Sequence, residues 1–232
     1  TAPPFHIPDK TPLLSRLGYT LTGAQSRAVD EIYNDMAFKK PMSRILCGDV
    51  GSGKTAVSLC AAYDAAVNGY TTALMAPTEI LAKQHFAEFS ELLEPLGIRV
   101  VLLCGSMSQT EKKRVHKILA GEECCIVIGT HALLSENVAF NRLGLVITDE
   151  QHRFGVDQRA ALRRKAGGAH MLVMSATPIP RTLSLIMFGD LAVSKLDEMP
   201  PGRRKVSTFA VDDSYRQRLW GFIRRQRDEG HC

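Results

Sequence analysis

The stretch CGDVGSGKTAV, residues 47–57, fits the pattern G-x-x-x-x-G-K-[ST] of a phosphate-binding loop. Glycines let the backbone turn so that consecutive N–H groups point at one anion, and a helix that follows adds the positive end of its dipole. The pattern predicts that Lys54 neutralises the β- and γ-phosphates and that the Thr55 hydroxyl binds Mg²⁺. The predicted loop consists of Gly48, Asp49, Val50, Gly51, Ser52, Gly53, Lys54 and Thr55.

A glycine-rich turn that binds nothing is the alternative interpretation of the same residues. The context argues against it, because the loop follows an apolar run (RILC, 44–47) and opens a helical pattern that stops near Asn68. Strand, loop and helix in this order are the surroundings that a phosphate loop requires.

Short apolar runs rich in β-branched residues recur along the chain and predict strands. Helical patterns lie between several of them, one after Thr78 that ends before Pro95, and one opened by Ser108 and Glu111 at capping-box spacing. Near-continuous apolar strands that alternate with helices predict an α/β fold, a mostly parallel sheet with helices on both faces. The predicted strands are residues 44–47, 71–76, 98–103, 124–128, 145–148 and 170–175.

A length of 232 residues suits one large domain, or one domain and part of another. We expect a domain over residues 1–199, with 1–11 as a flexible leader, and a linker over 200–205, where Pro200-Pro201-Gly202 breaks the pattern. Residues 206–232 are expected to form a strand and a basic helix that begin a further, truncated domain. From residue 203 onward the tail carries eight basic and four acidic residues, which could contact nucleic acid or form a solvated helix face; charge alone favours the latter.

Several classes of protein are disfavoured by composition. No apolar run approaches the 18 residues of a membrane span, and the N-terminus has no secretory signal. The six cysteines form no C-x-x-C pair and predict buried, reduced thiols of a cytosolic protein. The seven histidines are scattered, so we expect neither a zinc site nor a metal cluster.

A phosphate loop needs an acid for its metal ion, and the stretch GLVITDEQH (144–152) supplies one. Apolar residues run straight into Asp149 and Glu150, at the edge where parallel sheets bind ligands. We expect Asp149 to hold Mg²⁺ and Glu150 to orient and polarise the attacking water. The chain is therefore predicted to bind and hydrolyse a nucleoside triphosphate, and the absence of a guanine-reading N-K-x-D pattern favours ATP.

Six stretches, read in order, carry a family resemblance: TLTGAQ (20–25), GDVGSGKT (48–55), APTEILAKQHF (76–86), GTHALL (129–134), DEQHRFGVDQR (149–159) and SATPIPRTL (175–183). They resemble the motifs of the first RecA-like lobe of a superfamily 2 helicase. The last two, with MPPGR (199–203), are the most specific and resemble the RecG family of bacterial ATP-dependent DNA translocases. The resemblance covers roughly residues 12–232 and implies a RecA-like P-loop domain that works on forked and branched DNA.

The resemblance implies roles for further residues. Gln25 would read the adenine edge, since its amide offers both a donor and an acceptor. Coupling of hydrolysis to movement is implied for Gln151, His152, Ser175 and Thr177. Contact with the DNA backbone is implied for Pro77, Thr78, Gly129, Thr130 and His131, as expected of a motor that avoids reading bases.

The family pattern also implies partners within the parent protein: a complete second RecA-like lobe with its arginine finger, and an N-terminal wedge domain. Without them we expect residues 1–232 to fold and to bind ATP weakly, to hydrolyse it poorly and to unwind nothing. The alternatives are the lobe of a transcription-repair coupling translocase, which usually has Phe and Glu where this chain has Ser52 and Gln151, an RNA helicase lobe, and a non-catalytic nucleotide-binding module.

Overall fold

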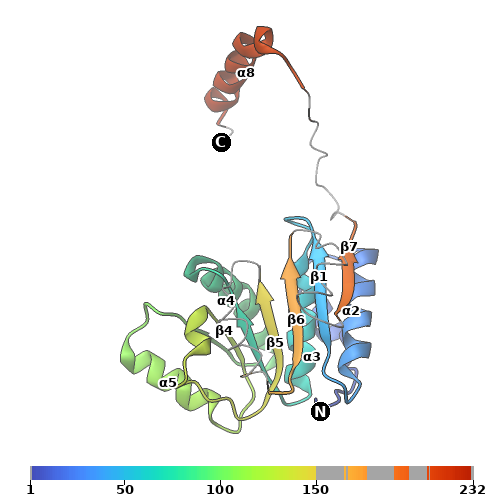
Figure 1. Cartoon of the computed structure of the whole chain (residues 1–232), viewed down its shortest axis with the longest axis vertical. Helices are drawn as coiled ribbons and strands as arrows, with labels where there is room; N and C mark the ends of the chain where they lie inside the picture. The colour runs from blue at the N-terminus through green and yellow to red at the C-terminus, as the bar shows by residue number, and fades with distance from the viewer. Residues whose placement is uncertain are drawn as a thin grey trace. The chain divides into compact units, whose positions relative to one another are not determined.

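The computed structural model describes residues 2–149, 165, 167–176, 191–198, 208 and 210–230. In this part of the chain seven strands form one sheet in the order β3-β4-β2-β5-β6-β1-β7, and each neighbouring pair is parallel (Figure 1). The strands are β1 (Ser43–Gly48), β2 (Thr71–Met75), β3 (Val100–Leu103), β4 (Ile126–Gly129), β5 (Leu143–Asp149), β6 (His170–Ser175) and β7 (Ala192–Leu196). The six predicted strands are confirmed.

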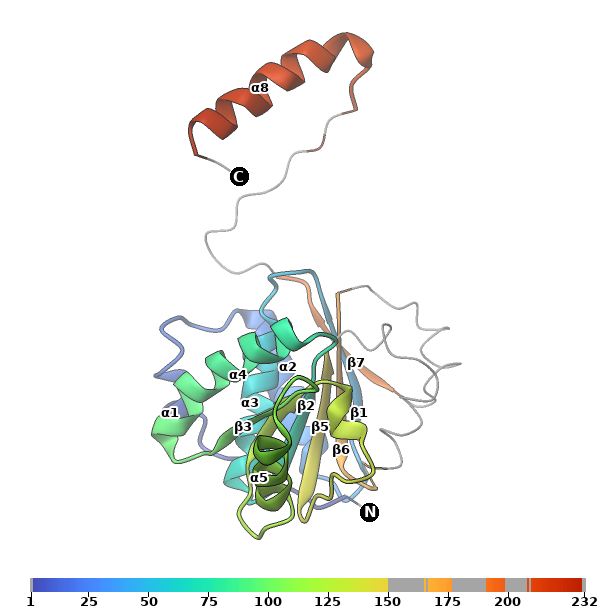
Figure 2. The same cartoon turned by 90° about the vertical axis from the view of Figure 1, so that its left-hand side faces the viewer.

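Helices cover both faces of the sheet, as predicted. The described helices are α1 (Thr11–Leu14), α2 (Gly23–Met36), α3 (Lys54–Val67), α4 (Glu79–Leu93), α5 (Gln109–Leu119) and α8 (Arg216–Asp228), with short 3₁₀ turns η1 (Glu94–Leu96), η2 (His131–Leu134) and η4 (Asp213–Tyr215). Helices α2, α3 and α4 lie together on one side of the sheet (Figure 2) and share a core with Leu74, Ile128 and Ile147. Their neighbours Met75, Val127 and Val146 point the other way and pack with α5.

Two helices begin at caps that can be read in the sequence. Ser108 accepts a hydrogen bond from the backbone N–H of Glu111, whose side chain returns to the Ser108 backbone, so the predicted capping box is confirmed. Helix α2 has the same reciprocal arrangement between Thr22 and Gln25. Parallel strands end at one edge of the sheet, so the C-terminal ends of β1, β2, β4, β5 and β6 all lie there (Figure 1).

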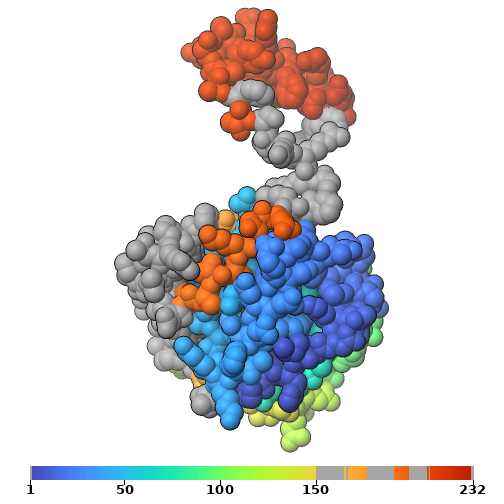
Figure 3. Space-filling view, turned by 90° about the vertical axis from the view of Figure 1, so that its right-hand side faces the viewer, coloured from blue at the N-terminus to red at the C-terminus, as the bar shows by residue number. Residues whose placement is uncertain are grey.

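An ionic network around the buried Arg44 links α2 to the sheet. The Arg44 guanidinium of β1, with its side chain 10% exposed, donates to Glu31 at 2.8 Å and to Asp35 at 2.9 Å, both on α2. It also donates to the Ser194 hydroxyl of β7 at 2.7 Å. Figure 3 shows α2 in blue beside β7 in orange on this face. The network matters for the site because α2 carries Gln25 toward the end of β1.

Ala2 and Phe5 of the N-terminal leader are packed against the domain, which differs from the flexible segment expected over residues 1–11. The backbone N–H groups of Ala2 and Phe5 donate to the carbonyls of Lys39 and Met36 at 3.0 and 2.9 Å. Phe5 is buried, stacks on Tyr70 at 5.2 Å and meets the edge of His170 at 4.9 Å. Burial of one aromatic ring contributes about 2 kcal/mol, and the prolines of this segment leave less conformational entropy to lose.

The chain divides into two compact units, residues 1–200 and 201–232. The predicted linker, 200–205, lies outside the described residues. In the second unit the expected basic helix is present as α8, which exposes Leu219, Trp220, Phe222 and Ile223. Whether this unit begins a second lobe stays a prediction.

No disulfide joins the described cysteines. Cys47, Cys60, Cys104 and Cys125 are buried, and Cys124 is half-buried. Burial raises the pKa of Cys60 to about 12 and that of Cys125 to about 11, so both thiols stay protonated and unreactive at neutral pH. Among the described helices none has both the length and the apolar character to cross a bilayer.

Candidate functional site

The phosphate loop leaves β1 at Gly48 and enters α3 at Lys54, the arrangement the motif requires. Gly51 and Gly53 take φ values of 80° and 84°, a left-handed conformation that favours glycine. A Cβ on Gly48 would lie 2.4 Å from the Ser52 hydroxyl oxygen, and one on Gly53 only 2.0 Å from Nε2 of Gln25. Glycine is therefore favoured at position 51 by the backbone conformation, at position 48 by a close neighbour and at position 53 by both.

The Lys54 ammonium folds back over the loop that it ends. Its Nζ donates to the carbonyl oxygens of Gly48 at 2.6 Å and of Asp49 at 3.0 Å. The positive charge is thus held at the mouth of the loop, beside the first turn of α3 and its dipole. Thr55 follows in that first turn and is half-buried, while Val50 at the tip of the loop is 73% exposed.

Gln25 is hydrogen-bonded to the phosphate loop. Its Nε2 donates to the Ser52 carbonyl at 2.9 Å, and its Oε1 accepts from the backbone N–H of Thr22 at 2.9 Å. The side chain is 2% exposed, so both halves of its amide are engaged inside the protein. Adenine reading by Gln25 stays a prediction, and it would require these bonds to open.

The predicted metal ligand Asp149 ends β5 at the same edge as the loop. Its Oδ2 lies 3.2 Å from Nε2 of His85 on α4, and the two side chains are only 14% and 10% exposed. His85 had no role in the sequence-based reasoning. The available signal was its position seven residues after Thr78, which places it about two turns into α4 and near the same side of the helix. Glu150 lies outside the described residues.

Strand β6 stands between the loop strand and the acid strand. Ser175 at its end is the register partner of Cys47, and Met174 pairs with Asp149. Ser175 is buried at the sheet edge where the site lies. The other three residues with an implied coupling role lie outside the described part of the chain: Gln151, His152 and Thr177.

The predicted DNA-contacting residues lie at the end of β4 and just after β2 and β4. These are neighbouring strands, and the Ala76 N–H donates to the Gly129 carbonyl at 2.8 Å. Thr78 and His131 are exposed, and Pro77 is half-buried. Gly129 and Thr130 are buried, so in this conformation only Thr78 and His131 are exposed enough to contact a phosphate. Thr78 also caps α4 by accepting from the Leu81 N–H at 3.3 Å.

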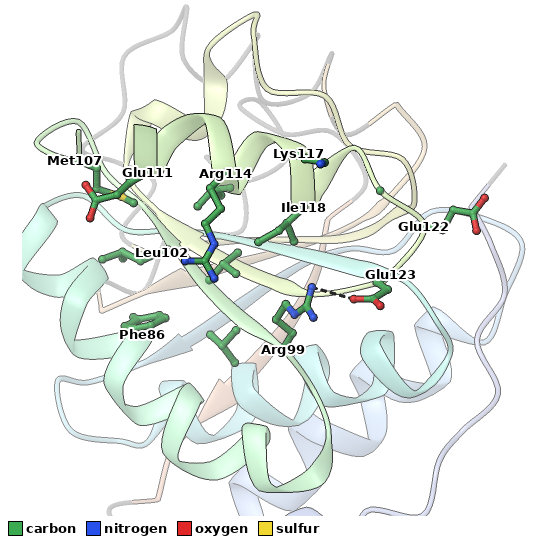
Figure 4. Close-up of a pocket in the computed structure, with 14 residues that line it drawn as sticks. Phe86, Arg99, Leu102, Met107, Glu111, Arg114, Lys117, Ile118, Glu122 and Glu123 are labelled. Carbon is green, nitrogen blue, oxygen red and sulfur yellow. Dashed lines mark ion pairs between the residues drawn. The ribbon is translucent and has the colours of Figure 1, made fainter. Parts of the chain in front are cut away.

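A separate cavity of about 800 Å³ lies away from this edge, between the edge strand β3, α4 and α5 (Figure 4). Apolar side chains such as Phe86, Leu102 and Ile118 line it, and Arg99 and Glu123 form an ion pair of 2.9 Å at its rim. It contains none of the predicted site residues.

The residues of the sheet edge fit a nucleotide with its metal ion. Turns at Gly51 and Gly53, the Lys54 ammonium and the start of α3 form a cradle for an anion. Within the described residues no three His, Cys, Asp or Glu side chains gather to hold a metal by themselves. Mg²⁺ does not need such a cage, because it commonly uses one or two protein oxygens, waters and substrate phosphates.

The chain belongs to the DEAD/DEAH box helicase family, whose pattern matches residues 22–186. Within that class it is similar over nearly its whole length to proteins named ATP-dependent DNA helicase RecG. The identity is 44% with that of Aquifex aeolicus (99% of this chain, 30% of the relative), 49% with that of Acidithiobacillus ferridurans (94% and 32%) and 46% with that of Bacillus subtilis (94% and 32%). The resemblance stated from the motifs is confirmed, and the chain spans about a third of the length of these relatives.

Solved structures agree with the sequence relatives. The chain is 43% identical to RecG in a structure of RecG bound to a three-way DNA junction, with a TM-score of 0.84 over 99% of this chain and 31% of that one. The helicase MrfA, with 19% identity and a TM-score of 0.69, shares the fold (94% of this chain, 36% of that one). The predicted RecA-like fold is confirmed.

Proposed function

We propose that this chain is the ATP-binding motor lobe of a RecG-like DNA translocase. The parent protein would couple ATP hydrolysis to the remodelling of replication forks and Holliday junctions in DNA repair and recombination. The observation that carries the proposal is the convergence, at one sheet edge, of the Lys54 loop after β1, Asp149 at the end of β5 and the exposed Thr78 and His131 after β2 and β4. One edge can then hold a nucleotide and a nucleic-acid backbone side by side.

In the proposed reaction the bound ATP·Mg²⁺ supplies the phosphoryl group whose transfer to water releases free energy. Lys54 would leave the carbonyls of Gly48 and Asp49 and neutralise the phosphates, while the loop N–H groups and the α3 dipole hold them. Thr55 and Asp149 are the residues proposed to hold the metal ion. Glu150 is proposed to orient the attacking water.

Other parts of the parent protein are proposed to complete the motor. A second RecA-like lobe would supply an arginine finger, whose contribution to rate is on the order of 10³–10⁵ in related enzymes. Ser175, with Gln151, His152 and Thr177, would transmit the hydrolysis state between lobes, and an N-terminal wedge domain would grip the branch point. We expect this machinery to act in the bacterial cytoplasm, and we expect residues 1–232 alone to hydrolyse ATP poorly and unwind nothing.

DNA, gripped by its backbone, is the proposed substrate. The relative solved on a three-way DNA junction supports it, because that protein matches 99% of this chain at 43% identity. Thr78 and His131 carry no bidentate base-reading groups such as Arg or Gln, which suits a motor that steps along any sequence.

The test is ATP hydrolysis by the full-length parent protein with forked DNA, linear duplex and single-stranded RNA as activators. We expect forked DNA to stimulate most strongly, and Lys54→Ala to abolish the stimulation. Stimulation by RNA alone would overturn the proposal. Equal stimulation by linear duplex would instead favour a translocase of the transcription-repair coupling type.

A further inference from the structure

The ring of His85 is held between α4 and the end of β5, on the inner side of the proposed metal site. Its Nε2 lies 3.2 Å from Oδ2 of Asp149, and both side chains are nearly buried. The tautomer of His85 sets the roles in this pair: with the proton on Nε2, the ring donates and the carboxylate oxygen Oδ2 accepts. Phe89, one turn further along α4, packs edge-on against the imidazole, with the two ring centroids 6.4 Å apart.

We propose that His85 is the positioning residue of Asp149: its Nε2–H holds Oδ2, so that Oδ1 remains for the metal ion of the nucleotide. The inference rests on the proposed function, since it assumes that Asp149 binds that ion. Carboxylates that bind metals are usually oriented by hydrogen-bond partners of this kind, and loss of such a partner typically weakens metal binding about 10–100-fold. A carboxylate at the end of a strand can otherwise rotate about its last side-chain bond, and each rotation moves the ligand oxygen.

The location of His85 gives the contact a second consequence. The same helix is capped by Thr78, one of the two exposed residues of the proposed DNA contact, and continues without a break to His85 and Phe89. Glu79 in its first turn also accepts from the backbone N–H of Ser106 at 2.9 Å, which anchors that end of the helix to the loop after β3. A displacement of α4 by a bound strand would therefore move the hydrogen-bond donor of Asp149.

Substitutions at His85 can separate its hydrogen bond to Asp149 from the packing of its side chain. His85→Leu keeps an apolar side chain of similar bulk and removes the donor, whereas His85→Gln keeps an amide N–H that can reach a carboxylate. Phe89→Leu is the matched control, because it disturbs the same buried side of α4 and leaves the N–H donor to Asp149 in place. Asp149→Asn marks the result expected when the ligand itself is lost.

The experiment is a titration of the full-length protein with Mn²⁺ in the presence of ADP, followed by electron paramagnetic resonance, with ADP affinity in EDTA measured in parallel. We expect His85→Leu to weaken Mn²⁺ binding about 10-fold or more, His85→Gln to restore most of it and Phe89→Leu to change it little. ADP affinity in EDTA should stay unchanged in all three.

Unchanged Mn²⁺ affinity in His85→Leu would overturn the inference, as would equal losses in His85→Leu and Phe89→Leu. Failure of the proposed function is recognised differently, in the unsubstituted protein. The proposed function requires that the wild-type protein bind Mn²⁺ when ADP is present and that Asp149→Asn abolish this binding. If either result is absent, both the proposed function and the inference are refuted.

Discussion

Gly53→Ala tests the geometry of the phosphate loop, because a Cβ at this position would lie 2.0 Å from Nε2 of Gln25. A non-glycine residue at φ 84° costs about 1–2 kcal/mol. Displacement of the Gln25 amide leaves the buried Ser52 carbonyl without its 2.9 Å donor, a further cost of about 1–3 kcal/mol. The loop conformation should therefore lose at least about 2 kcal/mol, and nucleotide affinity should fall about 30-fold or more, since 1.4 kcal/mol is tenfold.

The assay is equilibrium titration of the full-length protein with a fluorescent ATP analogue. Gly97→Ala is the matched control: its φ is 78°, nothing lies within 4 Å of the added Cβ, and it should lose stability without losing affinity. In a Gln25→Ala background the Gln25 amide that would clash with the new Cβ is absent, so Gly53→Ala should reduce nucleotide affinity by a smaller factor there. Wild-type affinity in Gly53→Ala, or an equal loss in both backgrounds, would refute the reasoning.

Two further changes should act on stability. In Gly129→Ala the new Cβ would lie 2.1 Å from the Leu103 backbone carbonyl, so the urea midpoint should drop by the equivalent of about 1–3 kcal/mol, and an unchanged midpoint would contradict this packing. Burial lowers the pKa of His170, whose ring accepts from the Met42 N–H at 3.0 Å and donates to the Pro3 carbonyl at 2.9 Å. The folded protein accommodates the neutral form of His170. Its contribution to the free energy of unfolding should therefore be complete above the unfolded pKa of about 6.5 and should decline as the pH falls below that value. Urea denaturation at pH 7.5 and 5.0 should show a smaller pH dependence in His170→Gln, and an identical dependence would argue against the assignment.

The sheet and the phosphate loop could be predicted because their signals are local. Strands buried on both faces are near-continuous apolar runs, and the glycines and Lys54 stand at spacings set by the anion they would hold. The strand β7 was missed, since Ser194 and Lys195 interrupt a run of only five residues at the edge of the sheet. Ser194 is polar there because it binds Arg44, a partner 150 residues away in the sequence.

Contacts between distant segments account for the other differences. The leader was expected to be flexible, yet Phe5 packs against Tyr70 and His170, which lie far away in the sequence. The pairing of His85 with Asp149 joins residues 64 apart and depends on where α4 crosses the end of β5. Such pairs are set by the packing of the whole fold, which neither periodicity nor motif spacing records.

The most direct measurement of the central claim is ATP-driven conversion of a synthetic replication fork by the full-length protein, resolved on a native gel, with Lys54→Ala beside it. The account predicts that the wild type converts the fork when ATP and Mg²⁺ are present. It also predicts that Lys54→Ala binds the fork with similar affinity and leaves it unchanged. Conversion at the wild-type rate by Lys54→Ala, or by the wild type without ATP, would contradict the claim that this phosphate loop powers work on DNA.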